Sequence, residues 1–464
     1  WVDGKEEEKS KVGGGGEENK ESGCADGGAP SSSRLNVLRL SPPAPPRSLR
    51  RGPLIVLYLF LRLVGLVYSL ARALWFEVPR GHAAVPVDCV LVQNPPSAPL
   101  LLIAWLYCAS QSKIRRRPRP GLVIDWHNLG YTMFDLPDAH PIRLLARRYE
   151  RAMAPLADGH LCVTSAMKTW LEHNFGVVPG EGRGGGNVAV LHDRPPSFFR
   201  PTGVPERHEL MARLRADWRE KCPELCREMG VDGDGDENER TLFTERAVDG
   251  SIRLRRDRPA LVISSTSWTP DEDFGVLLDA CVKLDETARK QNEGEYNDGK
   301  DENEGIGKGG SDQRSRPFPH VLVTVTGKGP QKSMYEERIS RLRLRYVHIV
   351  TIWLESSDYP LLLGCADLGV SLHASTSGLD LPMKVYDMFG CLVPVCALDF
   401  ACLGELVRDG ENGRVFRSGA ELAAQMRDLL GVIGQDEDLK ERGELAKLRE
   451  GVRGMTRWDE NWTE

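Results

Sequence analysis

The sequence predicts an α/β protein with two Rossmann-like halves, and three observations lead to that class. The chain has 464 residues, which is more than the ~250 at which a single domain usually stops growing, so two cores are expected. Short apolar runs alternate with helical patterns from residue 87 onward. This rhythm stops over a polar, helix-rich stretch near 200–255 and then starts again, which divides the chain into two repeats of one pattern.

Each repeat supplies strands and helices in alternation. Strands are expected at 87–92, 121–126, 160–165 and 187–193, with helices at 97–109, 141–155 and 166–175. The second repeat has strands at 259–265, 320–327, 346–351, 366–372 and 392–398, with helices at 271–289, 331–344 and 382–390. Such alternation is typical of a parallel sheet covered by helices on both faces. Open parallel sheets bind ligands outside the carboxyl ends of their strands, so a site is expected in the loops that follow them.

Composition shifts set the expected domain boundaries. Low hydrophobicity with Gly and Pro predicts a disordered extension at 1–33. The first Rossmann-like domain then covers 34–205, a connector covers 206–255, and the second domain covers 256–435 with a disordered polar insertion at 289–317. A helical tail follows at 436–464.

Several motifs and the charge balance exclude other classes. The net charge of −6 offers no basic field for nucleic acid, so that partner is excluded. The acidic stretch at 232–239 lacks the Gly and Glu that a calcium loop needs at its sixth and twelfth positions. The Gly-rich loop at 180–186 lacks the Lys and Ser/Thr of a phosphate loop. The eleven cysteines show no zinc spacing and are expected to be reduced structural thiols.

The apolar run at 54–76 allows three interpretations. Its 23 residues could cross a bilayer, but Arg62 and Arg72 would each cost about 2.5–3.5 kcal/mol near the centre of a spanning helix. A helix half sunk in a membrane surface and a helix buried in a domain core remain the alternatives.

Polar loops follow four strands of the second repeat, at 264–268, 326–330, 353–356 and 373–382. Gly378 lets the backbone approach a ligand, and Pro382 suits the first turn of the helix that follows. The free N–H groups of that helix, Lys384 in its first turn and Lys328 in a glycine-flanked loop would together hold a diphosphate. Asp387, one turn further on, would accept hydrogen bonds from ribose hydroxyls. The alternative is that Asp387 is a solvated helix carboxylate and Lys384 a surface charge.

The first repeat places VIDWHNLGY (123–131) at the end of a strand. His127 beside Asp125 could act as a general base, because imidazole titrates near neutral pH; a structural histidine is the alternative. The preceding strand ends in QNPP (93–96), which is expected to line the same cleft.

Longer motifs carry a resemblance to a known family. IDWHNLGY, CVTSAMK, SSTSWTPDEDF, VTGKGP, WLESSDYPLLLGCADLGVSLHASTSGLDLPMKVYDMFG and RWDENW occur in order from about 88 to 460. Together they resemble the chitobiosyldiphosphodolichol β-mannosyltransferases. The resemblance implies a GT-B glycosyltransferase fold, with two Rossmann-like domains facing a cleft.

The resemblance also implies a reaction and a place. The reaction is transfer of the first β-1,4-mannose from GDP-mannose to dolichyl-diphosphate chitobiose, on the cytosolic face of the endoplasmic reticulum membrane. The first domain would bind the acceptor and the second GDP-mannose. A membrane surface and other early N-glycan mannosyltransferases would be partners. Family members open with an anchor and a first β-α unit that we do not find before residue 34, so the first domain is expected to lack that unit.

The expected site residues follow from the strand ends and the resemblance. The donor is expected to contact Ser265, Ser267, Gly327, Lys328, Gly329, Ser377, Gly378, Leu379, Asp380, Lys384 and Asp387. The acceptor cleft is expected to contain Gln93, Asn94, Trp126, Asn128 and Tyr131, with His127 or Asp125 as the base. No D-x-D pair occurs within the loops at 264–268, 326–330, 353–356 and 373–382, so we expect neither a cofactor nor an essential metal. Two alternatives remain: a nucleotide-sugar transferase with a soluble acceptor, and an inactive truncated partner in a glycosyltransferase complex.

Overall fold

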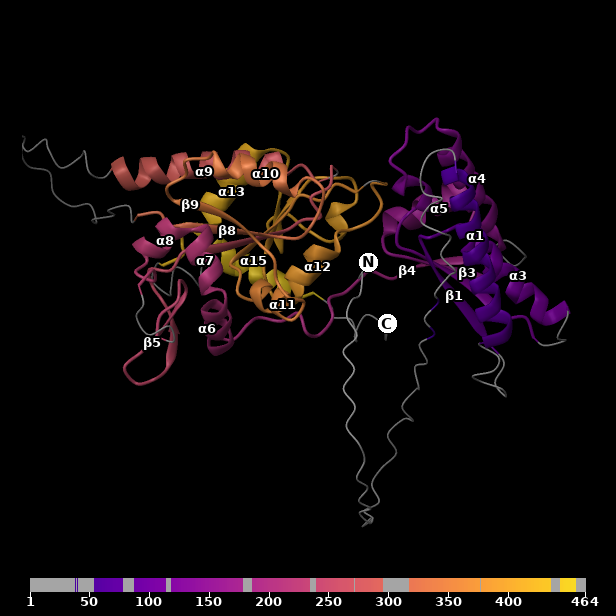
Figure 1. Cartoon of the computed structure of the whole chain (residues 1–464), viewed down its shortest axis with the longest axis horizontal. Helices are drawn as coiled ribbons and strands as arrows, with labels where there is room; N and C mark the ends of the chain where they lie inside the picture. The colour runs from indigo at the N-terminus through magenta and orange to yellow at the C-terminus, as the bar shows by residue number, and fades with distance from the viewer. Residues whose placement is uncertain are drawn as a thin grey trace, which may run out of the picture. The chain divides into compact units, whose positions relative to one another are not determined.

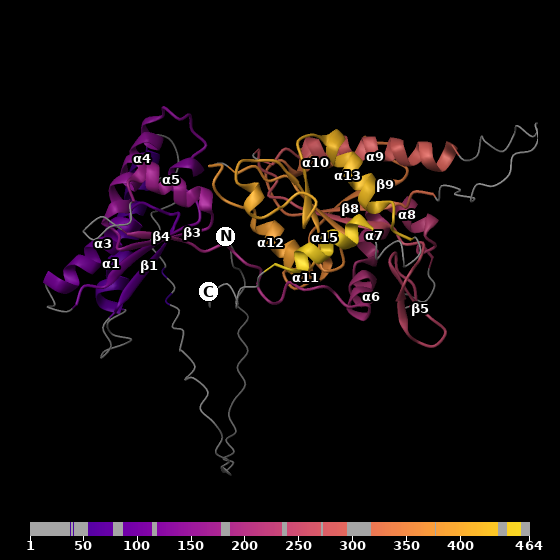
Figure 2. The ribbon, with the colours of Figure 1, turned by 180° about the vertical axis from the view of Figure 1, so that it is seen from behind.

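The computed structural model describes residues 38, 40, 54–77, 87–113, 118–177, 186–233, 239–270, 272–294, 317–375, 377–434 and 443–455. Two compact units are distinguished, Trp1–Gly65 and Leu66–Glu464, and the second contains both parallel sheets (Figures 1 and 2). The extension predicted to be disordered, 1–33, lies outside the described residues, and so does most of the insertion predicted at 289–317.

The first parallel sheet has four strands among the described residues, β1 to β4 in chain order. They are β1 (Cys89–Asn94), β2 (Gly121–Trp126), β3 (Gly159–Cys162) and β4 (Asn187–Val190). The helices between them are α3 (Leu100–Lys113), α4 (Pro141–Met153) and α5 (Ser165–Phe175), with short 3-10 turns η4 (Gly130–Met133) and η5 (Ala154–Leu156). Burial alternates along β2, which turns Leu122, Ile124 and Trp126 into the core.

The first strand ends two residues later than the sequence predicts. We expected it to end at residue 92, but Gln93 pairs with Asp125 and Asn94 pairs with Trp126 in the parallel ladder. Polar side chains at these positions suggested a loop. The backbone hydrogen bonds with β2 extend the strand in spite of that composition.

The connector contains three helices and a hairpin. The helices α6 (Val204–Arg213), α7 (Arg215–Lys221) and α8 (Pro223–Glu228) were expected in general terms. The antiparallel pair of β5 (Thr244–Arg246) and β6 (Ile252–Leu254) was not predicted, since both strands are only three residues long.

Among the residues that the structure describes, the second sheet has six parallel strands in the order β12-β11-β10-β7-β8-β9. These are β7 (Ala260–Ser265), β8 (Val321–Thr326), β9 (Val347–Ile352), β10 (Leu368–Ser371), β11 (Val395–Leu398) and β12 (Gly413–Phe416). This is the order of a doubly wound Rossmann sheet, in which the chain reverses direction between β7 and β10. The predicted α/β class, GT-B with two Rossmann-like parallel sheets, is confirmed.

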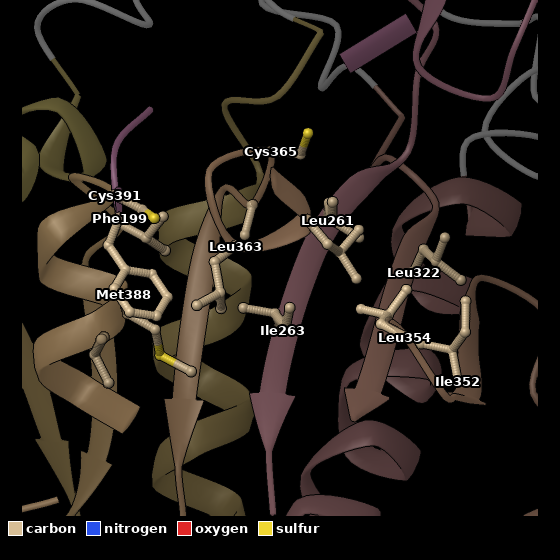
Figure 3. Close-up of a cluster of buried hydrophobic side chains, with 14 of the residues drawn as sticks. Phe199, Leu261, Ile263, Leu322, Ile352, Leu354, Leu363, Cys365, Met388 and Cys391 are labelled. Carbon is tan, nitrogen blue, oxygen red and sulfur yellow. The ribbon is translucent and has the colours of Figure 1, made fainter. Parts of the chain in front are cut away.

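Helices cover both faces of this second sheet. They are α9 (Phe274–Gly294), α10 (Lys332–Ser340), α11 (Asp358–Leu363), α12 (Met383–Gly390), α13 (Gly419–Leu430) and α15 (Glu444–Arg453), with a 3-10 turn η6 (Leu403–Glu405). Leu261 and Ile263 of β7 point to the core layer shared with α11 and α12, beside Leu363, in a cluster that also contains Met388 and Phe199 (Figure 3). The alternate residues of β7 point to the opposite layer, where α9 and α13 pack (Figures 1 and 2).

Helix α9 is longer than predicted. We placed its end at residue 289, where the insertion was expected to begin, but it continues to Gly294. Arg289 pairs with Asp285 one turn earlier, and Asn292 makes two hydrogen bonds to Phe318. These contacts hold polar residues in a helical turn that composition alone assigned to disorder.

The apolar run near the N-terminus forms helix α1 (Ile55–Arg72), followed by a π-helical turn, η3 (Ala73–Glu77). By length and composition, Leu57–Glu77 could cross a membrane. Most of its large apolar side chains are exposed, including Leu59, Phe60 and Tyr68. This exposure disfavours the interpretation as a buried core helix.

Asp285 on α9 provides a test of how the second sheet is held to its helices. Its carboxylate is buried and its Oδ1 accepts hydrogen bonds from the backbone N–H groups of Arg345, Tyr346 and Val347, at 2.8, 2.7 and 3.1 Å. We expect Asp285→Ala to lower the free energy of unfolding by about 2–4 kcal/mol, because three N–H donors lose their acceptor. Urea unfolding would measure the change.

Asp279 on the same helix provides the matched control. It is half exposed and pairs with Lys283 one turn along. Asp279→Ala should cost less than ~1 kcal/mol, since exposed ion pairs contribute little. Equal losses in the two variants would contradict the role assigned to Asp285.

Candidate active site

The reversal point between β7 and β10 brings two of the predicted loops to one edge of the second sheet. The loop after β7 contains Ser265 and Ser267, and the loop after β10 leads into α12. Lys384 Nζ lies 3.2 Å from Ser267 Oγ, so the two loops are in contact. Ligands of doubly wound sheets bind at this point.

Glycine is required where the loop after β8 meets the loop after β7. Gly327 has a φ of +128°, and a Cβ at this position would lie 1.8 Å from the Thr266 carbonyl oxygen. A Cβ on Gly329 would lie 1.8 Å from the carbonyl oxygen of Ser267. The sequence predicted these glycines at the site, and the structure gives their reason: one backbone passes directly over the other.

Lys384 is not a free cation in this arrangement. Its Nζ lies 2.6 Å from Oε1 of Glu272, which is only 4% exposed. The other carboxylate oxygen, Oε2, accepts a hydrogen bond from the Ser267 backbone N–H at 2.6 Å and another from the Thr266 hydroxyl. Glu272 therefore fixes both the loop after β7 and the lysine of α12, and the sequence analysis assigned it no role.

Lys328 lies over an aromatic ring. Its Nζ is 3.5 Å from the centre of the Trp353 ring, which is a cation–π geometry. Trp353 follows β9 and is 56% exposed, an unusual position for a tryptophan. The sequence analysis named its loop as part of the site but gave the ring no function.

Helix α12 starts at Met383, one residue after Pro382, and no side chain caps it. Asp387 lies on its second turn, and burial raises the pKa of its carboxyl to about 7. The charge of Asp387 contributes to raising the pKa of Tyr359, and the Tyr359 hydroxyl lies 3.0 Å from Ser265 Oγ. Asp387 and Ser265 therefore belong to the same neighbourhood.

The loop before α12 forms a separate hydroxyl–carboxylate cluster. Asp380 Oδ1 accepts hydrogen bonds from Ser377 Oγ, at 3.2 Å, and from Ser375 Oγ, while His373 Nε2 lies 3.7 Å from Oδ2. Burial would raise the pKa of Asp380, but the nearby His373 and the hydrogen bond from Ser375 outweigh it and the pKa is lowered. Gly378 has a φ of +72° with no atom near its Cβ position, so it serves the turn.

In the first sheet, His127 and Asp125 are joined as predicted. His127 Nε2 lies 3.0 Å from Asp125 Oδ2, and both side chains are partly exposed. This hydrogen bond raises the pKa of His127, against the opposing effect of burial. Asp193, after β4, raises it further through its charge and was not predicted.

Two predicted acceptor residues are corrected by the structure. Trp126 is fully buried, and its Nε1 donates to His160 Nδ1 at 3.0 Å, so it is a core residue that cannot line a cleft. Asn94 is also fully buried, and its Nδ2 donates to the Asn128 carbonyl oxygen at 3.1 Å. Gln93 is exposed at the end of β1.

Asn128 and Tyr131 are partly exposed. The side chain of Asn128 is used within its own turn, where Oδ1 accepts from the Leu129 N–H at 2.7 Å. Tyr131 packs against Trp170, and Arg147 lies 5.8 Å from the centre of its ring.

Glu150 on α4 holds the two predicted strand-end loops together. It is 1% exposed, and its Oε1 accepts from the Gly130 N–H at 2.8 Å and from the Ser97 hydroxyl. A Cβ on Gly130 would lie 2.6 Å from that same oxygen. Burial raises the pKa of this carboxyl. The loops after β1 and β2 are therefore fixed around His127 by a residue that the sequence analysis did not identify.

Hydrogen bonds also link residues that come after strands of the first sheet to residues that come after strands of the second. Thr164 Oγ1 donates to the Leu379 carbonyl oxygen at 2.6 Å, and Glu405 accepts from the backbone N–H groups of Ser165 and Ala166 at 2.7 and 2.9 Å. His192 Nε2 lies 3.1 Å from the same Glu405 carboxylate. Within the described ranges, no cluster of three His, Cys, Asp or Glu is arranged to hold a metal.

Comparisons with known proteins place the chain in a family. A family model described as "Glycosyl transferases group 1" matches residues 312–431. The chain is similar to "UDP-glycosyltransferase TURAN" of Arabidopsis thaliana, with 40% identity over 94% of this chain and 87% of that protein. It is 38% identical to the mouse "Chitobiosyldiphosphodolichol beta-mannosyltransferase", over 93% of this chain and 78% of that protein.

Solved structures also align with the chain. A glycosyltransferase from Rickettsia africae aligns with a TM-score of 0.48 and 13% identity, covering 89% of this chain and 86% of that one. The sequence relatives are much more similar, and they span most of both chains. The chain is a glycosyltransferase and belongs to the chitobiosyldiphosphodolichol beta-mannosyltransferase family.

Proposed function

We propose that the chain transfers a mannosyl group from GDP-mannose to the 4-hydroxyl of the terminal GlcNAc of dolichyl-diphosphate chitobiose, forming a β-1,4 bond. Family membership supports the acceptor, since the mouse and Dictyostelium relatives carry it in their names. The observation that carries the proposal is the convergence of Ser267, Lys384 and the start of α12 where the second sheet reverses.

The donor diphosphate would lie against the uncapped start of α12. Its free N–H groups and the helix dipole favour a negative charge. Lys384 of this helix and Lys328 of the loop after β8 would add two cations. As the C1–O bond of mannose breaks, its electron pair goes to the leaving GDP. Donors fixed at that place stabilise the growing charge more than they stabilise the bound substrate. The two lysines act without a metal in this proposal.

Catalysis by the His127–Asp125 pair follows from its hydrogen bond. If Nε2–H donates to Asp125, Nδ1 is the nitrogen left to accept a proton. The acceptor 4-hydroxyl oxygen attacks C1 of the α-linked mannose from the opposite side and gives its proton to that nitrogen. One displacement converts the α-linked donor into a β-linked product.

Attachment to the endoplasmic reticulum membrane, on its cytosolic face, completes the proposal. A dolichol-linked acceptor stays in the bilayer, so the enzyme must work at its surface. The exposed apolar side chains of α1 are suited to lipid contact.

A transfer assay tests the reaction. Radiolabelled GDP-mannose is incubated with the full chain and phytanyl-diphosphate chitobiose, and the lipid product is analysed for a labelled trisaccharide. UDP-sugars are run in parallel, because the Arabidopsis relative is named a UDP-glycosyltransferase. A labelled lipid trisaccharide from GDP-mannose alone is expected. Transfer from a UDP-sugar, transfer only to a soluble acceptor, or binding without turnover would contradict the proposal.

The pH profile of kcat/KM tests the base. Because its hydrogen bond to Asp125 raises the pKa of His127, the neutral base is lost as pH falls through a pKa above the ordinary value of 6.5. Asp125→Asn weakens that effect, so the acidic limb should move to lower pH. His127→Gln should lower kcat by about 100- to 10,000-fold. An acidic limb that stays in place in both variants would exclude this pair.

Asp387 should make stability depend on pH. Its folded pKa of about 7 exceeds the model-peptide value of 3.8, so the folded state binds the proton more tightly and stability falls as pH rises from about 4 to 7. Asp387→Asn removes this dependence. The variant should gain on the wild type across that window, by at most about 4 kcal/mol, in urea unfolding at pH 4.5 and 7.5. If the free energies of unfolding of the variant and the wild type differ by the same amount at pH 4.5 and at pH 7.5, Asp387 titrates normally and the prediction is wrong.

A further inference from the structure

Four arginines line a cavity at the other edge of the second sheet. The cavity has a volume of about 270 Å³ and is lined by Arg207 of α6, Arg258 before β7, and Arg449 and Arg453 of α15. Asp367, which precedes β10, is the one carboxylate in the lining. Arg258 and Asp367 lie at the amino ends of the strands whose carboxyl ends form the candidate donor site. Since β7 has six residues, the two places are separated by ~20 Å along the strand.

Asp367, the one carboxylate in the lining, is already paired with Arg258. Arg258 makes two hydrogen bonds to Asp367, at 2.7 and 2.8 Å, and the Leu261 N–H donates to the same Oδ2 at 2.9 Å. Both side chains of this pair are at most 10% exposed. Arg449 reaches only the carbonyl oxygen and Oδ1 of Asp367, at 3.3 and 3.5 Å. Arg258 therefore neutralises most of the negative charge of Asp367.

Arg207 has no carboxylate partner within the described residues. Its Nε is buried and makes no hydrogen bond there. Burial lowers the pKa of Arg207, and repulsion from Arg258 and Arg449 acts in the same direction; together they outweigh the attraction of Cys365 and Asp367, which raises it. Arg453 pairs with Glu450 on the same helix but is 61% exposed, so its guanidinium can turn toward the cavity. The cavity thus holds more positive than negative charge.

We propose that this cavity is a binding site for a phosphoryl group, distinct from the donor site. A guanidinium group can bind two phosphate oxygens at once. Several arginines around one cavity can therefore bind a tetrahedral dianion better than they can bind a ligand with a single carboxylate. The volume equals that of roughly nine liquid waters, which is enough for a phosphate or diphosphate. The group is either a free phosphate compound or the headgroup of an anionic lipid.

The linker between the two repeats forms part of the same cavity. Thr202 lines it, its N–H donates to the Gly364 carbonyl oxygen at 3.1 Å, and its hydroxyl donates to the Leu361 carbonyl oxygen at 2.8 Å. A Cβ on Gly364 would lie 2.3 Å from Thr202 Oγ1, so the linker packs tightly against the end of α11. An anion held by Arg207 and Arg449 would therefore join the linker, the sheet and the last helix.

Binding of inorganic phosphate and pyrophosphate to the full chain tests the proposal. Isothermal titration at constant ionic strength is performed with GDP present in excess, which occupies the proposed donor site. The wild type should bind, and Arg207→Gln should bind roughly tenfold more weakly or worse, because a charged hydrogen-bond donor is lost. Arg453→Gln, at an exposed position with little risk to folding, should weaken binding in the same direction.

Arg213→Gln is the matched control. Arg213 lies on the same helix as Arg207, is half exposed and pairs with Asp358 outside the cavity. This variant should bind phosphate as the wild type does. Flotation with phosphatidic acid vesicles, compared with phosphatidylcholine vesicles, separates the two sources: loss of flotation in Arg207→Gln assigns a lipid headgroup, and titration with free phosphate alone assigns a soluble ligand. Absence of both, or equal binding by wild type, Arg207→Gln and Arg453→Gln, would overturn the proposal.

Discussion

The parallel pairing of β7 with β10 is the constraint on which the candidate site depends. It joins two strands about a hundred residues apart in the chain, and it places the loops that follow them at one edge of the sheet. The contact of Ser267 with Lys384 is possible only because of that pairing. The loop after β8 is then fixed by Gly327 and Gly329, where any side chain would strike the neighbouring backbone.

Buried carboxylates hold both sets of strand-end loops. Glu272 binds the loop after β7 and the lysine of α12, while Glu150 binds the loops after β1 and β2. A buried carboxylate that accepts several N–H and O–H donors is stiff, because loss of any donor leaves a desolvated charge. This arrangement supports reacting groups with little movement of the side chains around them. Neither glutamate touches a substrate in the proposed reaction.

Much of the fold could be predicted because alternation of apolar strands and helices is a local property of the sequence. The same rule located the strand ends and led to the predictions for Lys384, Asp387 and His127. Trp126 was misassigned, although the alternation of Leu122, Ile124 and Trp126 already puts it on the buried face. Glu150 and Asp193 were missed because their partners lie on other elements, and nothing in the sequence near them records that contact. Glu272 was missed although Thr266 and Ser267 lie in its own loop, because its third partner, Lys384, is distant in the sequence.

The ion pair between Lys384 and Glu272 also sets a threshold for what can occupy this edge. A ligand with a single negative charge that pulled Lys384 away would leave the buried Glu272 carboxylate without its cation. Breaking such a buried ion pair costs about 3–5 kcal/mol. The free energy gained by binding chloride or a lone carboxylate is too small to offset that cost. A group with several negative oxygens can engage the lysine while it still touches its partner. In the proposed donor site, this edge would therefore select ligands by charge density before the sugar or the base is recognised.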